Sequence, residues 1–569
     1  MSGNTLQAQA ELLRRRAADL AGDLSRSARR TATIAQERAV LRMLGVDGLD
    51  RVGRPLAASL AERYCGSDRG RLARGVILPF VAALLEYDLP ARELALDVAA
   101  GAVDLGLEAE LLERPVRLAA AQKRASSMIE AALVRFDANR TVGRDMREVL
   151  GLPDQPWLGV ALQAAEVEPA AAEIRGLVDR GADVIAVRVP ASWEFAEARR
   201  QAGLETSDLF EFEVGDRSRR GDRGGSSGRR GATGAAGSRS AKGKRRSPAT
   251  KPDPEQVPAG SQRGLAALRK ATDDATARRG CYASLMTVAS AFAAPEQAVV
   301  AAFERVDYVV ADPIREIVED NVDPERALAD HAFAHRLQAR AGSRVVIGAG
   351  PLALGADLAS GLPSDAVTRS GRGLALQALG VELALADGLP RDRLFLGAVP
   401  DWVGADGVPA SILIESWLRS LVFSGHSLVV SGAAARSSAP GGVAWLVSAL
   451  AGGSVALVIG PAAVDRVDVA AADLRAAAGA SSALRAMLGD GGLHGDAADV
   501  ADRTLRAASE TLERLAAEGW GSLIGPGGPG SRAGQGVEDG VGSEMLGGAA
   551  AVERADGPTS GARLLQVLG

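Results

Sequence analysis

The sequence is poor in cysteine, lysine and aromatic residues, and each shortage excludes something. Two cysteines, Cys65 and Cys281, among 569 residues argue against a secreted fold built on disulfides. Aromatic residues make up 4%, so alanine, leucine and valine must fill the core of a chain that is 47% hydrophobic. Almost all basic residues are arginine, and the five lysines leave few side chains able to form a Schiff base. The net charge of -5 indicates no particular partner.

The chain also lacks clear membrane signals. Its first twenty residues contain no apolar stretch of the kind found in signal peptides. Residues 441–464 carry no charge and are long enough to span a bilayer, but Gly452 and Gly453 divide them into a helix-length piece and a β-rich piece, SVALVIG. We interpret this stretch as a buried helix followed by a buried strand, and we expect a cytoplasmic protein without a membrane partner.

The spacing of apolar residues predicts an α/β fold with helical additions. Residues 1–150 have the periodicity of helices and form a predicted accessory region. From Trp157, unbroken apolar runs alternate with helical segments over residues 151–465. The candidate strands are 157–163, 182–189, 282–290, 307–314, 344–350, 393–400, 426–432 and 454–460. Eight such repeats predict a (β/α)8 barrel, the TIM-barrel fold.

Three further segments complete this organisation. Residues 216–260 are rich in glycine, serine and arginine and poor in large apolar residues, so we expect a disordered insertion in a barrel loop. Arginine and glycine tracts can bind RNA, but here a solvated excursion is the favoured interpretation and nucleic-acid binding is not expected. Residues 466–520 are expected to form C-terminal helices, and residues 521–569 a glycine-rich tail.

Candidate anion-binding residues follow the second predicted strand. The apolar run 184–187 stops at Arg188, and Ser192 lies four residues later. Functional groups of such barrels lie at the carboxyl ends of the strands, where Arg188 and Ser192 could hold a phosphate or a carboxylate. The alternative, a surface arginine that closes a strand, remains open.

Other motifs are explained without a catalytic role. Gly348 and Gly350 match a dinucleotide-binding fingerprint formally, but their strand is fifth of eight rather than first, so an NAD(P)-dependent oxidoreductase is kept as a minor alternative. His331 and His335 are four residues apart without the glutamate of a zinc motif, which favours core or solvent-facing histidines over metal ligands. Asp323 before Pro324 is typical of a helix N-cap.

Several stretches together resemble the α subunit of lysine 5,6-aminomutase and, more distantly, the barrel of D-ornithine 4,5-aminomutase. The stretches lie in the family's order and cover residues from about 30 to 520. They are TATIAQERAVLRMLGVDGLD (31–50), AGAVDLGLEAELLE (100–113), GADVIAVR (181–188), SQRGLAALRKATDD (261–274), APEQAVVAAFERVDYVVAD (294–312) and ERALADHAFAHR (325–336).

The resemblance implies a TIM-barrel isomerase that works as a heteromer. Such enzymes use pyridoxal 5'-phosphate (PLP) and adenosylcobalamin to move the terminal amino group of lysine or a similar diamino acid to the neighbouring carbon by a radical route. The resemblance also implies a β-subunit partner that binds the cobalamin and supplies the lysine that forms the PLP Schiff base. No Asp-x-His-x-x-Gly motif for cobalamin is present in this sequence, in keeping with that division.

The resemblance also assigns cofactor-binding positions. It places Ser290 where the family has a serine that contacts PLP, and it matches Arg188 and Ser192 to the family's arginine and serine after the second strand if the alignment slips by one residue. The family's tyrosine and arginine of the fourth strand fall at Arg315 and Asp320. An aspartate in place of an anion-binding arginine opposes phosphate binding unless Arg188 or Arg315 compensates. A barrel that has lost the reaction and serves as a scaffold therefore stays open.

Overall fold

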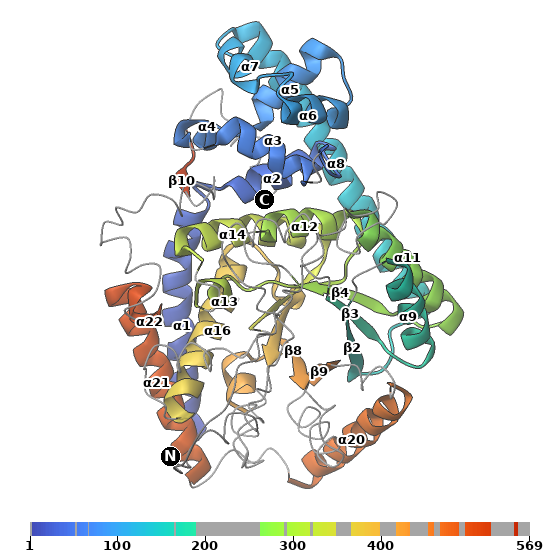
Figure 1. The fold of residues 1–569 in the computed structure, drawn as a ribbon. Helices are drawn as coiled ribbons and strands as arrows, with labels where there is room; N and C mark the ends of the chain where they lie inside the picture. The colour runs from blue at the N-terminus through green and yellow to red at the C-terminus, as the bar shows by residue number, and fades with distance from the viewer. Residues whose placement is uncertain are drawn as a thin grey trace, which may run out of the picture.

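Eight parallel strands close into a barrel in chain order, from β2 to β9 (Figure 1). The computed structural model describes residues 3–51, 54–66, 68–163, 167–188, 262–288, 293–318, 322–348, 366–398, 417–432, 453–459, 467–488, 496–524 and 551–555. The strands are β2 (Trp157–Gln163), β3 (Val184–Arg188), β4 (Ser284–Val288), β5 (Tyr308–Val310), β6 (Arg344–Ile347), β7 (Leu394–Ala398), β8 (Ser427–Gly432) and β9 (Gly453–Ile459). Pairing of β9 with β2 closes the ring. The predicted TIM barrel and its eight strand segments are confirmed.

β5 is shorter than the apolar run that predicts it. The strand ends at Val310, and the chain turns into the helix α13 (Pro313–Val318). The carboxylate of Asp312 accepts hydrogen bonds from the backbone N–H groups of Ile314 and Arg315 at 3.0 and 3.3 Å. These bonds satisfy amides at the start of a helix, which ends the strand early.

Side chains from alternate strand positions fill the barrel interior. Tyr308 and Phe395 pack edge to face there, with ring centroids 5.2 Å apart. The interior cluster consists of Trp157, Val184, Ala186, Met286, Tyr308, Val310, Val346, Phe395, Val429, Val455 and Leu457. The barrel is therefore a filled core, and binding groups must lie at its ends.

Helices surround the strands on the outside. They are α9 (Val167–Asp179), α11 (Gln262–Arg279), α12 (Ala294–Phe303), α13, α14 (Pro324–Ala341), α16 (Ala366–Ala386), α20 (Val467–Leu488), α21 (Asp496–Glu518) and α22 (Gly521–Ile524), with a 3-10 turn, η2, at Arg391–Arg393. α14 begins as predicted, because the side chain of Asp323 accepts from the backbone N–H of Arg326 at 3.0 Å. The amphipathic pattern after residue 496 likewise forms α21 as predicted.

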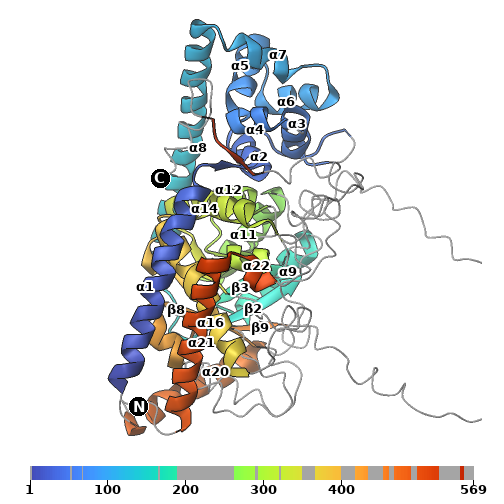
Figure 2. The ribbon, with the colours of Figure 1, turned by 90° about the vertical axis from the view of Figure 1, so that its left-hand side faces the viewer.

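The N-terminal helices occupy two places (Figures 1 and 2). α1 (Gly3–Ala28) runs along the barrel against α16 and α21. The helices α2 (Ile34–Met43), α3 (Leu56–Cys65), α4 (Arg69–Arg74), α5 (Ile77–Tyr87), α6 (Ala91–Ala100) and α7 (Leu105–Leu111) lie beyond α12 and α14. The long helix α8 (Pro115–Leu150) contacts α5 and also α12 and α14. It thus joins the outer helices to the barrel.

A buried ion cluster fixes α2 to the barrel. The carboxylate of Glu296 on α12 accepts from Arg38 at 2.8 Å and from Arg42 at 3.2 Å. All three side chains are at most 6% exposed. A buried charge without a partner is costly, so this cluster opposes movement of α2 relative to α12.

A short strand from near the end of the chain joins this N-terminal region. β10 (Val552–Glu553) pairs antiparallel with β1 (Thr31–Ala32). The high glycine content of residues 521–569 predicts a loop, but residues 551–555 are apolar or charged and form ordered backbone pairs. The side chain of Arg554 then lies 3.7 Å from the Glu37 carboxylate on α2.

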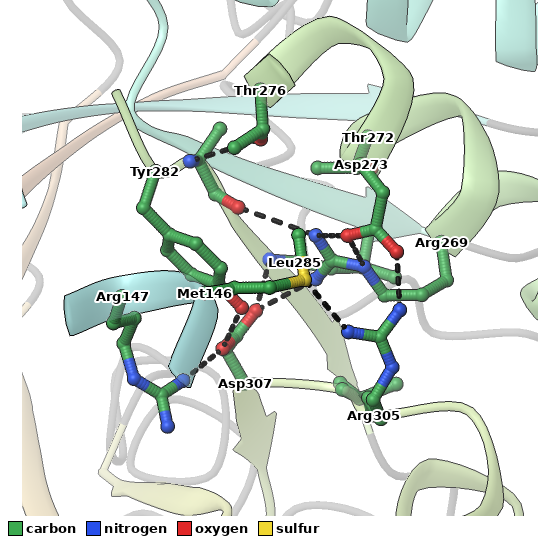
Figure 3. Close-up of polar contacts among 12 residues, drawn as sticks. Met146, Arg147, Arg269, Thr272, Asp273, Thr276, Tyr282, Leu285, Arg305 and Asp307 are labelled. Carbon is green, nitrogen blue, oxygen red and sulfur yellow. Dashed lines mark hydrogen bonds and ion pairs between the residues drawn. The ribbon is translucent and has the colours of Figure 1, made fainter. Parts of the chain in front are cut away.

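Two aspartates tie the amino-terminal ends of the strands together. Asp307, just before β5, accepts from the backbone N–H of Leu285 on β4 at 2.9 Å, and from Arg147, Arg269 and the Tyr282 hydroxyl at 2.8 Å each (Figure 3). Asp183, just before β3, accepts from the N–H of Leu158 on β2 at 2.9 Å. This end of the barrel is thus rich in fixed ionic contacts.

Two sequence predictions fall wholly or partly outside the described residues. The insertion 216–260 is one of them. Of the uncharged stretch 441–464, residues 453–459 form the barrel strand β9, as predicted for its second half. Among the helices that the structure describes, none combines the length and hydrophobicity needed to cross a membrane.

Candidate functional site

The carboxyl ends of β5, β6 and β7 form the best-described part of the barrel mouth. Asp312 follows β5, and its Oδ2 accepts from the backbone N–H of Gly348, just after β6, at 2.7 Å. Its Oδ1 caps α13, as described above. The buried carboxylate of Asp312, which is 6% exposed, therefore holds two strand ends and the start of a helix in place.

Gln377 of α16 continues this arrangement to β7. Its side-chain nitrogen donates to the carbonyl of Gly397 at 2.7 Å and to that of Ile347 at 3.3 Å. Its oxygen accepts from Arg419 Nε at 3.1 Å. Gly348 has a φ of +77°, and a Cβ there would lie 2.6 Å from the Gln377 nitrogen. Glycine is required at this position by both backbone conformation and space.

Arg315 lies close in sequence to these strand ends. It lies on α13, three residues beyond Asp312, and is 9% exposed. A guanidinium has five N–H donors and can bind a phosphate or carboxylate through two of them while keeping contacts to the protein. Arg315 is the predicted site residue whose side chain the structure describes, and its role in binding stays a prediction.

Beside Arg315, Glu316 contacts a buried histidine. His331 Nε2 of α14 lies 2.9 Å from Glu316 Oε1. Burial lowers the pKa of His331 to about 4, although Asp312, Asp330 and Asp387 act in the opposite direction. The imidazole is therefore neutral near pH 7, and its one proton is best placed on Nε2, facing the carboxylate. Nδ1 is buried and has no hydrogen-bond partner within the described residues.

The other helix histidine is also buried and paired. His335 Nδ1 lies 2.9 Å from the carboxylate of Asp387, which also accepts from the Ser25 hydroxyl at 2.6 Å. The two imidazole centroids are 5.7 Å apart. Both histidines thus belong to the core rather than to solvent. Within the described ranges, no three histidine, cysteine, aspartate or glutamate side chains are grouped so as to hold a metal ion.

The remaining predicted site residues are less fully described. Arg188 is the last residue of β3, and its Cα pairs with that of Gln163 on β2. Its backbone therefore ends at the same edge of the barrel as β5, with β4 between them. Ser192 and Ser290 lie outside the described residues, as do Asp320 and Gly350.

The structure adds mouth residues that sequence reasoning missed. Asp312 shares the alternation of the inward-facing Tyr308 and Val310, a signal that could have identified it. Gln377 gave no such signal, because it comes from a helix. The dinucleotide interpretation loses its structural context, since β6 lies within a closed barrel rather than at the start of a doubly wound sheet.

Comparison with known proteins identifies relatives of this chain. A family model described as the D-lysine 5,6-aminomutase TIM-barrel domain of alpha subunit matches residues 5–192 and 259–401. The chain is 24% identical over 367 residues to the lysine 5,6-aminomutase alpha subunit of Fusobacterium nucleatum, covering 64% of this chain and 59% of that protein. It is 24% identical over 388 residues to the alpha subunit of Acetoanaerobium sticklandii, covering 68% and 63%. The matches thus span about three fifths of these curated relatives.

A solved structure of dihydropteroate synthase from Anaplasma phagocytophilum is also similar. It shares 12% identity with this chain, covers 57% of it and 98% of the synthase, and gives a TM-score of 0.32. A score of that size supports no functional statement. The matched family segments, in contrast, extend from α1 across six barrel strands, β2 to β7.

Proposed function

Because the chain belongs to the family of the lysine 5,6-aminomutase α-subunit TIM barrel, we propose that it is the barrel subunit of an aminomutase. The proposed reaction moves the terminal amino group of lysine, or of a similar diamino acid, to the neighbouring carbon. The observation that carries the proposal is the family match over the N-terminal helices and six strands of the barrel. The relatives named above support the aminomutase class.

The described mouth suits an anionic cofactor such as PLP. Arg315 supplies a cation there. The neighbouring acids are engaged, Asp312 by three backbone N–H groups and Glu316 by His331. Both acids are therefore hydrogen-bonded within the protein, and an incoming phosphate or carboxylate would meet the guanidinium. This fit is the structural support for PLP at this end of the barrel.

In the proposed mechanism the protein binds and orients while the cofactors supply the reactivity. PLP would stabilise the migrating amino group electronically, and adenosylcobalamin would supply the radical that starts the reaction. Arg315, with Arg188, Ser192 and Ser290, would hold the phosphate and the substrate carboxylate. Asp312 and Gln377 keep the strand ends fixed. The side chains that fill the barrel interior keep water from reaching the mouth through the barrel.

A partner subunit is part of the proposal. Lys123 on α8 and Lys270 on α11 are the lysines within the described residues, and both are exposed on outer helices. Neither position suits a Schiff base at the mouth. We therefore assign that lysine, and the main cobalamin-binding surface, to a β-subunit partner. The free thiols of Cys65 and Cys281 support a cytoplasmic location.

PLP binding tests this proposal. Purified chain is titrated with PLP, alone and with a candidate cobalamin-binding partner, and the visible absorbance of PLP is followed. Arg315→Ala is expected to weaken binding by roughly tenfold or more, because it removes charge-assisted hydrogen bonds to an anion. Ser290→Ala and Arg188→Ala are expected to weaken it as well.

The control is Arg391→Ala, an exposed arginine of η2 before β7, at the opposite end of the barrel. It should leave PLP binding unchanged. Absence of PLP binding in both conditions contradicts the proposal and favours a barrel that acts as a scaffold. Binding of NAD(P) in place of PLP would revive the oxidoreductase alternative.

A further inference from the structure

A hollow lined by arginines lies at the amino-terminal end of the barrel, opposite the proposed cofactor site. It is bounded by α8, by the turn before β5 and by the end of α14, and it is partly open to solvent. Arg140, Arg147 and Arg305 line it, with Asp307 at its inner wall. Figure 3 shows Arg147 and Arg305 on either side of Asp307.

Cations outnumber carboxylates around this hollow. Asp307 is paired with Arg147 and Arg269. Asp273 is paired with Arg269 and Arg305. A fourth arginine, Arg140, lines the same hollow and donates to the backbone carbonyl of Arg340 at 3.3 Å. Four arginines thus meet two carboxylates, which leaves an excess of two positive charges.

The surrounding residues add to this positive field. Arg344 and Arg393 lie nearby, at the amino-terminal ends of β6 and β7. The pKa of Arg393 is lowered by burial, then by repulsion from Arg344, Arg147 and Arg140, with Asp392 acting in the opposite direction. Repulsion between guanidinium groups across this end of the barrel is relieved when an anion binds among them.

Two neutral polar side chains that line the hollow are already engaged by backbone carbonyls. Asn139 uses its side-chain N–H group on the carbonyls of Ala302 and Phe303, and the Ser343 hydroxyl donates to the carbonyl of Val306. Arg147 donates to the Asp307 carboxylate through one of its five N–H groups. The lining therefore offers N–H donors on charged groups, which is the chemistry of an oxyanion site.

A glycine positions the outermost arginine. Gly342 ends α14 with a φ of +76°, and a Cβ on it would lie 2.9 Å from both Cγ and Cδ of Arg140. The aliphatic part of Arg140 thus lies against the bare backbone of Gly342, and its guanidinium is held at the rim. Any larger residue at position 342 would displace it.

We propose that this hollow binds a phosphate group, either as the free ion or as the end of a small phosphate ester. A small, partly open hollow lined by guanidinium groups suits a compact tetrahedral anion. The three lining arginines, from α8 and from the turn before β5, would surround it. The site is separate from the mouth, because the full length of the strands lies between them.

Titration of the whole chain with inorganic phosphate at constant ionic strength tests this site. Arg140→Gln is the test variant because Arg140 is exposed and its loss should leave the fold intact. Arg124→Gln, also exposed and on the same helix α8, is the matched control. We expect wild type and Arg124→Gln to bind alike, and Arg140→Gln to bind roughly tenfold more weakly. Thermal unfolding without phosphate checks that each variant is folded.

Two further arms separate the sources of the signal. Tighter binding of glycerol phosphate than of inorganic phosphate identifies an ester ligand, and the reverse identifies the free ion. Arg315→Ala, at the opposite mouth, should retain phosphate binding. The proposal is overturned if wild type does not bind phosphate, if Arg140→Gln binds as well as Arg124→Gln does, or if Arg315→Ala abolishes binding.

Discussion

At the scale of single residues, the buried His331 makes stability depend on pH. Its folded-state pKa is about 4, below the ordinary value of 6.5, because burial disfavours the charged form. Between these two values the unfolded chain binds a proton that the folded chain does not. Stability from this residue is therefore complete above pH 6.5 and is lost as the pH falls toward 4.

Replacing this histidine should flatten the acid side of the stability profile. His331→Gln is expected to lose less stability between pH 7 and pH 4.5 than the wild type does, by about 2 kcal/mol. Urea unfolding at the two pH values measures the difference. The pKa of Asp330 is raised by burial, so its contribution has the opposite sign, but it is present in both proteins and cancels. Equal pH dependence in the two proteins would contradict the assignment.

Single residues also show how far the sequence predicts the site. Asp323 was predictable as a helix cap because its partner is three residues away. Arg315 was assigned to the site by resemblance; it lies on α13, directly after β5, and its binding role stays a prediction. Asp312 and Gln377 were missed, because their partners lie on other strands and pairing between strands is not visible in local spacing.

At the scale of elements, aspartates before β3 and β5 repeat one arrangement. Asp183 and Asp307 each accept a backbone N–H from the preceding strand and an arginine from α11, Arg279 and Arg269 respectively. Burial lowers the pKa of Arg269, but Tyr282, Asp307 and Asp273 raise it by more, so this arginine stays charged. A buried charge of this kind depends on its carboxylate partners.

Removing the charge of Asp307 should therefore be costly. Asp307→Asn leaves Arg269, which is 3% exposed, paired with Asp273 but without the Asp307 carboxylate, and we expect a loss of about 3 kcal/mol in the free energy of unfolding. Tyr282→Phe removes one hydrogen bond to the same carboxylate and should cost about 1 kcal/mol. Urea unfolding measures both.

The control for this pair is Asp392→Asn, an exposed aspartate at the same end of the barrel. It should change stability by less than about 0.5 kcal/mol. If Asp307→Asn is no worse than Asp392→Asn, the ionic cluster does not hold these strands. Both variants replace an aspartate by asparagine, but Asp307 is buried and Asp392 is exposed.

Elements were predictable where the hydrophobic pattern is decisive. The eight barrel strands are buried on both faces, so their unbroken apolar runs stand out against the periodic helices. β10 was not predictable, because two residues carry no pattern and its partner β1 is at the other end of the chain. The short β5 reflects Asp312, whose capping role depends on side-chain geometry.

At the scale of the whole molecule, Arg554 and Glu37 link the two ends of the chain. Burial raises the pKa of Glu37 and lowers that of Arg554, while each partner opposes the shift in the other. Glu37 also accepts from the backbone N–H of Val76 at 2.7 Å. The separation of 3.7 Å from Arg554 makes an ion pair rather than a hydrogen bond.

Arg554→Ala is expected to destabilise the protein by about 3 kcal/mol, since it leaves Glu37 buried without its cation. Glu37→Gln in the same chain should recover part of the loss, because the uncompensated charge is then gone. A double-mutant cycle by urea unfolding measures the coupling. Additive effects of the two substitutions would show that the ion pair does not couple these segments.

The pairing of β1 with β10 also sets an order for folding during synthesis. The side chain of Arg554 contacts that of Gln36 across a sequence separation of 518 residues. On the ribosome, α2 and the barrel are made long before their last partner emerges. Glu37 therefore lacks its ion-pair partner until residue 554 has been synthesised. Closure of this contact is therefore expected to be a late step in folding.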